Sequence, residues 1–209
     1  MSPDWLFKAL LALVRSVEES GRMRSIVTDR LILRPWEEGD ADFLFDLESR
    51  WETVRYLGAD PTPMRSKSEA VASIQRRRAL DHPVHGIWAI ACRDSNALAG
   101  NLLLKPAHLS AGASGERPVE IGWHLHPSAQ SLGFATEAAA GVLTDAASRG
   151  LASVLAVTDP RNSASHRVCR RLGFAEEGIT SRFYDSPQLV FSRVLSGDTP
   201  PTPASHTVR

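Results

Sequence analysis

The chain has 209 residues, 43% of them hydrophobic and 23% charged, which are ordinary proportions for a globular domain. Its 24 basic and 24 acidic residues give a formal net charge of zero. This balance argues against general nucleic-acid binding, because that function usually needs a basic surplus. The two cysteines, Cys92 and Cys169, lack the spacing of a metal site or a disulfide framework. We therefore expect one domain plus tails in a reducing, cytoplasmic setting.

Residues 1–24 are expected to be an N-terminal extension outside the domain. The apolar run from Trp5 to Val14 is interrupted by Lys8 and is shorter than the ~20 residues that span a bilayer. No small-x-small cleavage site follows before Arg22, which disfavours a signal peptide. We expect an amphipathic helix, or a start codon placed too early with Met23 as the alternative start, and no membrane association.

Residues 25–195 are expected to hold the domain. Residues 26–35 predict a first strand, and Asp40 predicts the N-cap of a helix that runs to about residue 49. The capping box Ser66-x-x-Glu69 predicts a helix to about residue 80, on which the run Arg76-Arg77-Arg78 should face solvent. Residues 86–93 and 97–104 predict two strands joined by a turn. Residues 107–118 form a long loop of small residues, and loops of that length are often functional.

The stretch from residue 120 to residue 137 predicts a strand, a tight turn and the start of a helix over 135–149. Ile121, Trp123 and Leu125 alternate with smaller or polar residues, as in a strand with one buried face. The loop that follows has no Lys or Arg and ends at Gly133 and Ala135. Backbone N–H groups of such a loop can converge with the positive end of the helix dipole. The stretch therefore predicts an anion site suited to phosphate.

The remaining elements are a strand over 151–158, a helix from Asn162, and short strands over 174–177 and 188–195. Asn162 is a good helix N-cap, and Gly173 suits a left-handed C-terminal cap. From Ser196 onward the chain is rich in Pro, Thr and Ser, and residues 196–209 should be a disordered tail.

Several of these segments resemble one known family. Gln130-x-x-Gly133-x-Ala135 resembles the acetyl-coenzyme A pyrophosphate loop of the GNAT N-acetyltransferases, and the string Gly133-Phe134-Ala135-Thr136-Glu137-Ala138 is similar to the RimJ/RimL branch. The segment Thr28-Asp29-Arg30-Leu31-Ile32-Leu33-Arg34-Pro35 resembles the opening of that branch, and residues 162–174 resemble its second coenzyme A-contacting helix. The resemblance covers roughly residues 27–195. It implies an α/β fold of the α+β type, a single GNAT domain whose mixed, mostly antiparallel sheet of six to seven strands is flanked by about four helices.

The resemblance also implies acetyl-coenzyme A as a co-substrate, held between the strands that end near Leu125 and Thr158. Ser131 stands where this loop often has Gly. The pair His124-x-His126 lacks a third ligand nearby in the sequence, so no metal is expected. The cofactor-contacting residues that the resemblance implies are Leu125, Gln130, Ser131, Leu132, Gly133, Phe134, Ala135, Thr136, Asn162 and Ser165.

For catalysis, the resemblance implies that Glu120 is the base, because RimL-like enzymes use a Glu in this Glu-Ile-Gly-aromatic setting to deprotonate the amine. Strand alternation places Glu120 and His124 on one face, and His124 is the second candidate base. A charged residue on a solvated sheet face is the competing interpretation. Ser165 is implied as the proton donor to the leaving thiolate, since Cys169 stands where many GNAT enzymes have a Tyr acid. Cys169 itself should be a packed core thiol and not a nucleophile.

The function expected on this basis is transfer of an acetyl group from acetyl-coenzyme A to a primary amine, by direct attack in a ternary complex. The acceptor is a protein N-terminus or a small amine, which the sequence does not decide. Whether the protein is a monomer or a homodimer is equally open. The alternative is a non-catalytic regulatory module that holds acyl-coenzyme A on a GNAT fold, and the intact Glu120 and Ser165 weigh against it.

Overall fold

The computed structural model describes residues 23–80 and 82–195. The expected helix near Trp5–Val14 and the tail from Ser196 therefore lie outside the described residues. Eight strands form one sheet in the order β1-β2-β3-β4-β5-β6-β8-β7. The strands are β1 (Ile26–Val27), β2 (Leu31–Pro35), β3 (Gly86–Cys92), β4 (Leu98–Pro106), β5 (Val119–Leu125), β6 (Ser153–Thr158), β7 (Ala175–Thr180) and β8 (Gln188–Val194).

The described ranges hold five α-helices. They are α2 (Ala41–Ser49), α3 (Trp51–Val54), α4 (Lys67–Arg78), α5 (Phe134–Ser148) and α6 (Ser163–Arg171), together with the 3-10 turns η1 (Glu38–Asp40) and η2 (Pro127–Ala129). The α+β class is confirmed, with one strand and one helix more than expected. The extra strand arises because residues 26–35 form a hairpin, closed by the Thr28 N–H donating to the Leu31 carbonyl at 2.9 Å. The extra helix is the single turn α3.

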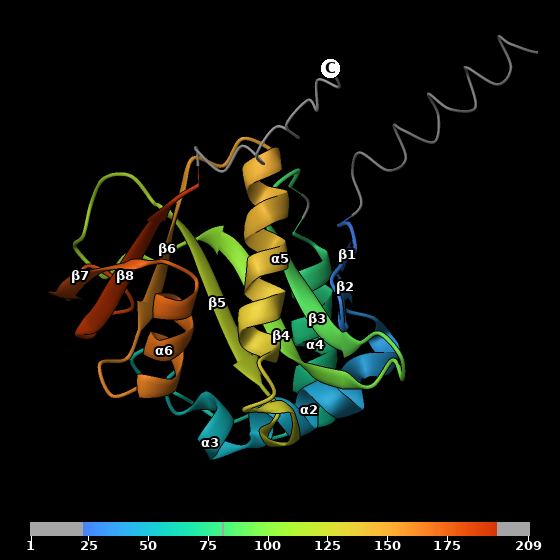
Figure 1. The fold of residues 1–209 in the computed structure, drawn as a ribbon. Helices are drawn as coiled ribbons and strands as arrows, with labels where there is room; N and C mark the ends of the chain where they lie inside the picture. Colours follow the sequence, from blue (N-terminus) through green and yellow to red (C-terminus); the bar gives the residue numbers. More distant parts are fainter. Residues whose placement is uncertain (1–22, 81, 196–209) are drawn as a thin grey trace, which may run out of the picture.

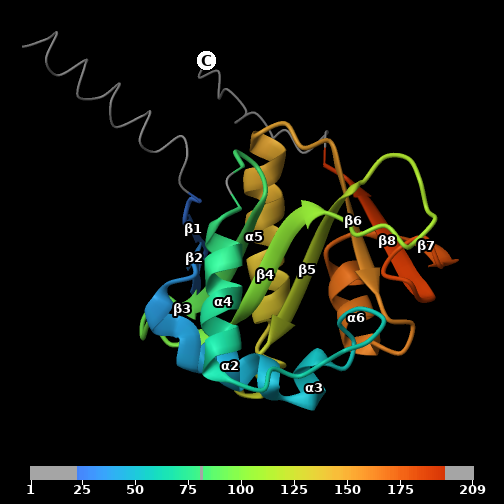
Figure 2. The same ribbon diagram turned by 180° about the vertical axis from the view of Figure 1, so that it is seen from behind.

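Helices cover both faces of the sheet. Figure 1 shows α5 and α6 on one face, and Figure 2 shows α2 and α4 on the other. The first face carries the larger core, in which α5 residues such as Val142 and Leu143 pack on Leu102 and Ile121 of the sheet. The second face has a smaller core around Trp36, Leu44, Leu47, Ile74 and Ala89.

The sheet opens between β5 and β6. β5 and β6 run parallel, and their register joins them at one position, Glu120 with Leu155. Beyond that point the two strands separate toward α3, as both ribbon views show. Parallel neighbours normally pair along their length, so this separation leaves part of the β5 edge without a strand partner among the described residues. The gap is where the site lies.

The helix caps predicted from the sequence form as expected at Ser66 and Asn162, and the cap predicted at Asp40 does not. The Ser66 hydroxyl accepts a hydrogen bond from the Glu69 N–H at 3.3 Å, and the Asn162 side chain accepts one from the Ser165 N–H at 3.2 Å. Asp40 precedes α2 as expected, but the prediction that its side chain caps α2 is wrong. That carboxylate accepts hydrogen bonds from the Glu37 N–H and from the Arg34 guanidinium, so it closes the preceding 3-10 turn instead.

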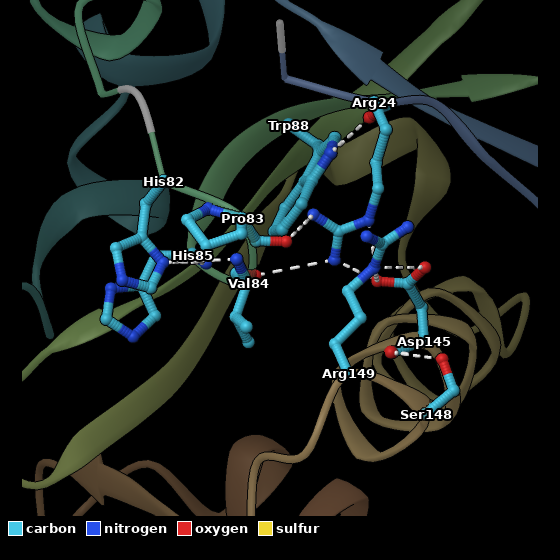
Figure 3. A network of polar contacts seen from close by, with 9 residues as sticks. All are labelled: Arg24, His82, Pro83, Val84, His85, Trp88, Asp145, Ser148 and Arg149. Carbon is cyan, nitrogen blue, oxygen red and sulfur yellow. Dashed lines mark hydrogen bonds and ion pairs between the residues drawn. The ribbon is translucent and has the colours of Figure 1, made fainter. Parts of the chain in front are cut away.

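A polar network fixes the start of the domain, at the end of α5 that lies away from the gap (Figure 3). The Arg24 guanidinium donates to Asp145 of α5 at 2.7 Å and to the Pro83 carbonyl at 3.0 Å. The Trp88 indole N–H of β3 donates to the Arg24 carbonyl at 2.8 Å. Met23 also contacts the core, and the Ile87 N–H donates to its sulfur at 3.3 Å. Every helix of residues 23–80 and 82–195 is too short or too polar to cross a membrane.

Candidate active site

The loop between β5 and α5 has the backbone of an anion site. Ser131 and Gly133 both take left-handed conformations, with φ of +63° and +82°. These two residues turn the chain so that the first N–H groups of α5 face the loop, and such groups have no partner inside the helix. Gly133 suits this backbone because it has no Cβ, whereas Ser131 takes it at some conformational cost. The residues present therefore fit the diphosphate of coenzyme A.

Glu137, in the first turn of α5, is ionised and paired with Arg30 of the opening hairpin. Its Oε1 accepts hydrogen bonds from the Thr28 hydroxyl and the Arg30 N–H, each at 2.7 Å, and its Oε2 accepts one from the Arg30 guanidinium at 2.7 Å. These bonds and the Arg30 charge hold the pKa of Glu137 below its usual value despite the desolvation that opposes them. Two segments that carried the family resemblance, residues 28–35 and 133–138, thus meet in space.

A cavity of about 380 Å³ runs along this loop and the adjacent gap. Nine of the ten residues implied for cofactor contact line it, from β5, the loop and the first turns of α5 and α6. The exception is Leu132, whose side chain is 51% exposed and whose carbonyl accepts a hydrogen bond from Arg30 at 3.0 Å. We call this space the cofactor cavity.

The edge of β5 that faces the gap presents backbone donors. The His126 N–H donates to the Ala99 carbonyl at 2.9 Å, on the β4 side of the strand. Since successive N–H groups of a strand point to opposite edges, the Leu125 N–H is directed toward the gap. The Leu125 carbonyl accepts a hydrogen bond from the Gln130 side chain at 3.2 Å, which joins the loop to this edge.

A second cavity, of about 400 Å³, lies against the face of the sheet that α2 and α4 cover. Its floor is made by alternate residues of the two paired strands, with Lys105 of β4 opposite Glu120 of β5 and Asn101 opposite His124. We call it the acceptor-side cavity. It adjoins the cofactor cavity, and the residues that line both are Tyr56, Leu57, Trp123, His124, Asn162 and Ser165.

Glu120 lies in the acceptor-side cavity and is only 5% exposed. The Tyr184 hydroxyl, from the loop between β7 and β8, donates a hydrogen bond to its Oε2. Burial raises the pKa of Glu120 to about 7, although the Tyr184 hydrogen bond and the Lys105 charge oppose the rise. A carboxyl with a pKa near neutrality can accept a proton and release it again at physiological pH.

His124 is held by a carboxylate from α2. Its Nε2 lies 3.0 Å from Glu48 Oε1, and Arg77 of α4 donates to the same oxygen at 2.5 Å. Burial alone would raise the pKa of Glu48, but His124 and Arg77 outweigh it and hold that pKa below its usual value. The expectation that the arginine run of α4 faces solvent is wrong for Arg77, whose side chain is 13% exposed and lies over the Trp36 ring.

Each histidine of the pair contacts a carboxylate of α2. His126 contacts Asp46 at 3.0 Å, beside the His124–Glu48 pair. Among residues 23–80 and 82–195, no group of three or more His, Cys, Asp and Glu side chains is placed to hold a metal ion.

On α6, Ser165 lines both cavities, while Cys169 is fully buried in the core. Burial raises the pKa of the Cys169 thiol to about 12, so the thiolate that nucleophilic attack needs is scarce at neutral pH.

The sequence did not predict the contact of Tyr184 with Glu120, nor that of Glu48 with His124. Tyr184 lies 64 residues from Glu120 in the chain, in a loop with no periodic pattern. One local signal existed, since aromatic Phe183 and Tyr184 precede a turn-forming Asp185-Ser186-Pro187, but it does not specify a contact with β5.

Comparison with known proteins agrees with this geometry. A family model described as an acetyltransferase (GNAT) domain matches residues 30–175. YoaA of Bacillus subtilis, named an uncharacterized N-acetyltransferase, is 35% identical over 158 residues, which make up 75% of this chain and 85% of YoaA.

Solved structures share the fold. A GNAT-family acetyltransferase from Bacillus anthracis has a TM-score of 0.66 at 19% identity, over 82% of this chain and 99% of that one. RimL, a ribosomal-protein α-N-acetyltransferase in complex with coenzyme A, has a TM-score of 0.65 at 22% identity, over 82% of this chain and 98% of that one.

The sheet opens beside a loop whose backbone suits an anion, a geometry that does not by itself define an activity. The family match and the identity to YoaA then give the particular assignment. The chain belongs to the GNAT acetyltransferase family, and it is an acetyltransferase enzyme whose donor is acetyl-coenzyme A.

Proposed function

We propose that the enzyme acetylates a primary amine by direct attack in a ternary complex. The observation that carries this proposal is the junction of the two cavities at Trp123, His124 and Ser165. A donor in the cofactor cavity and an amine in the acceptor-side cavity would meet there without a covalent enzyme intermediate. Holding both reactants in one geometry removes much of the entropic cost of a bimolecular step.

Glu120 is assigned the role of general base. An amine of the lysine type has a pKa of ~10.4 in water and arrives protonated at neutral pH. The buried Glu120 carboxylate, with its pKa of about 7, can take that proton directly or through one water molecule. His124, oriented by Glu48, is the second candidate base.

The donor is held by the loop and by the β5 edge. Ser131, Gly133 and the start of α5 would bind the diphosphate, and the Leu125 N–H would stabilise the negative charge that develops on the carbonyl oxygen. Ser165, at the junction of the cavities, would donate a hydrogen bond to the leaving sulfur. The remaining residues assigned to the donor, Gln130, Leu132, Phe134, Ala135, Thr136 and Asn162, would position it through loop and helix contacts.

The acceptor is a protein N-terminus or a small amine, acetylated in the cytoplasm. RimL, with the same fold, is named for acetylating a protein α-amine, which favours the first class without deciding it. The acceptor-side cavity offers both signs of charge, with Glu48 and Glu120 beside Arg77 and Lys105.

The test is release of coenzyme A from acetyl-coenzyme A in the presence of a panel of amines, which covers N-terminal peptides, lysine side-chain analogues and small diamines. We expect at least one class to accelerate release by a large factor over water, with the acetylated amine found by mass spectrometry. Donor binding with no acceleration by any amine would favour a module that only binds acyl-coenzyme A.

Cys169→Ala should cost stability and leave the chemistry intact. The thiol is buried beside Leu172 and Phe174, so the smaller side chain leaves a small cavity, and we expect a loss of about 1 kcal/mol in the free energy of unfolding. Because the substituted group touches neither cavity, kcat should stay within about twofold of the parent. Denaturant unfolding and steady-state rates of the variant check both values. A stable but inactive variant would contradict the assignment of Cys169 to the core.

A further inference from the structure

The loop between β7 and β8 has an unusual backbone at Tyr184. Tyr184 and the next residue, Asp185, both lie in the left-handed region, with φ of +59° and +53°. Side chains with a Cβ adopt that region rarely, and two in succession persist only where the surrounding contacts hold them. Such backbone is a reason to look for function at this loop.

The contacts that hold it come from the long loop over residues 107–118. Backbone bonds run from the Ser110 N–H to the Arg182 carbonyl at 2.9 Å and from the Tyr184 N–H to the His108 carbonyl at 3.3 Å. Asp185 adds two more, accepting from the Ala111 N–H at 2.7 Å and donating its own N–H to the Ser110 hydroxyl at 2.8 Å. We call residues 107–118 and 181–187 together the clamp.

The clamp places the Tyr184 hydroxyl in the acceptor-side cavity. Phe183 is buried with Ala107 and Val190, and Tyr184 packs against this cluster while its hydroxyl reaches Glu120 of β5. Its hydroxyl donates to Oε2 of Glu120 and is the one hydrogen-bond donor to that carboxylate among the described residues. Oε1 is then the Glu120 oxygen that accepts no hydrogen bond from the described residues and is open toward the cavity.

We propose that Tyr184 is a positioning residue for the acetyl transfer, fixing which Glu120 oxygen faces the acceptor and stabilising the ionised form of that carboxylate. This inference rests on the proposed role of Glu120 as the base. Tyr184 stays protonated while it does so, because burial and the Glu120 charge raise the pKa of its phenol. The clamp is then the part of the chain that sets the geometry of the base.

Other charged groups also face this cavity. Lys105 of β4 lies opposite Glu120 and favours the ionised form of that carboxylate. The charge of Arg117 opposes the rise in the pKa of Tyr184. Further along the cavity lie Glu48 of α2, Arg77 of α4 and His124 of β5, which pair with one another. Since all of these are unchanged by a substitution at Tyr184, a change in the titration of Glu120 in that variant reports the lost hydroxyl.

The test is Tyr184→Phe, with two separate readouts. The first is the titration of the Glu120 carboxyl, followed by NMR of protein labelled with ¹³C-glutamate. The Glu120 signal is assigned as the one that is missing from the spectrum of Glu120→Gln. Loss of a hydrogen bond to a charged group should raise the Glu120 pKa by about one to two units. The second readout is the ratio of kcat/KM between variant and parent at each pH, in which the titration of the amine cancels.

The expected ratio is near one well above both pKa values and falls to about a tenth or less below them, because the variant loses its ionised base earlier as pH falls. A ratio lowered equally at every pH would show a merely structural role, and an unchanged Glu120 titration would overturn the inference outright. A raised Glu120 pKa without any movement of the rate profile supports the Tyr184 contact and counts against Glu120 as the base. The failure of the inference and that of the proposed function are therefore distinguishable.

Controls come from the same cavity and the same clamp. Tyr56→Phe removes the other tyrosine hydroxyl of the chain, also in this cavity, and should leave the Glu120 titration unchanged. Asp185→Ala removes the acceptor for the Ala111 N–H and should shift the titration in the same direction as Tyr184→Phe. Asp185→Asn keeps an acceptor oxygen and tolerates the left-handed backbone, so it should restore the parental value. An equal shift in the Ala and Asn variants would contradict the role given to the clamp.

Discussion

Glu120→Gln lowers kcat/KM by about 10²–10⁴-fold, the range expected for loss of a general base, and leaves acetyl-coenzyme A binding near the parental value. The substitution keeps the size of the side chain and an oxygen that can accept from Tyr184, so it removes basicity and little else. Rates over pH 6 to 10 and donor titrations check the two halves of the prediction. The variant should recover part of its activity at high pH, where more free amine is present.

His124→Gln is the matched control, since it removes the second candidate base from the same strand and cavity. We expect a smaller loss than in Glu120→Gln. If instead the His124 variant loses more, the base is the His124–Glu48 pair and the role given to Glu120 is wrong.

The same Glu120 variant should gain stability relative to the parent as pH rises. In the parent, Glu120 has a folded pKa of about 7 against an ordinary value of 4.5, so the folded protein holds this proton more tightly than the unfolded chain. Stability from this group is therefore fully present below pH 4.5 and is lost as pH rises toward 7 and beyond. Glu120→Gln has no such proton, and the difference in Tm between variant and parent should increase from pH 5 to pH 8. A constant difference would show that Glu120 is not buried as a carboxylic acid.

Gly133→Glu abolishes the stabilisation that acetyl-coenzyme A confers on the parent. At 100 times its dissociation constant the donor should add about 2.7 kcal/mol to the free energy of unfolding. In the variant a Cβ meets Arg30 at 3.3 Å on a backbone with φ of +82°, and the new carboxylate repels a diphosphate. Thermal unfolding with and without the donor gives the comparison.

Gly150→Glu is the control for Gly133→Glu. Gly150 has φ of +87°, with nothing within 4 Å of an added Cβ, and it lies just beyond the far end of α5. The Gly150→Glu variant should lose stability from the same backbone strain, but acetyl-coenzyme A should stabilise it as much as it stabilises the parent. A shift lost in both variants would mean that the donor effect does not depend on the loop.

Local patterns predicted much of this fold. The alternation in β5, the caps at Ser66 and Asn162 and the left-handed Gly173 after α6 are properties of short segments, so the sequence alone carries them. The split of residues 26–35 into two strands was missed because both halves begin with apolar residues and only three residues lie between them.

The groups around the candidate base depend on packing between distant segments. Arg77 looked like part of a solvated run, yet α4 is rotated so that this one arginine reaches Glu48 of α2. Tyr184 reaches Glu120 only because two loops pair and direct it toward β5. Neither arrangement leaves a periodic signal in the chain, and the sequence therefore predicted the candidate base without the residues that shift its pKa.

The most direct test of the account is an initial-rate study with both substrates varied, joined to the intact mass of the enzyme after it has met acetyl-coenzyme A alone. Direct attack across the junction of the two cavities predicts intersecting lines in double-reciprocal plots and a protein mass that does not change when the amine is withheld. Parallel lines, with one acetyl group gained by the protein at a rate that matches turnover, would show a covalent intermediate and contradict the ternary complex.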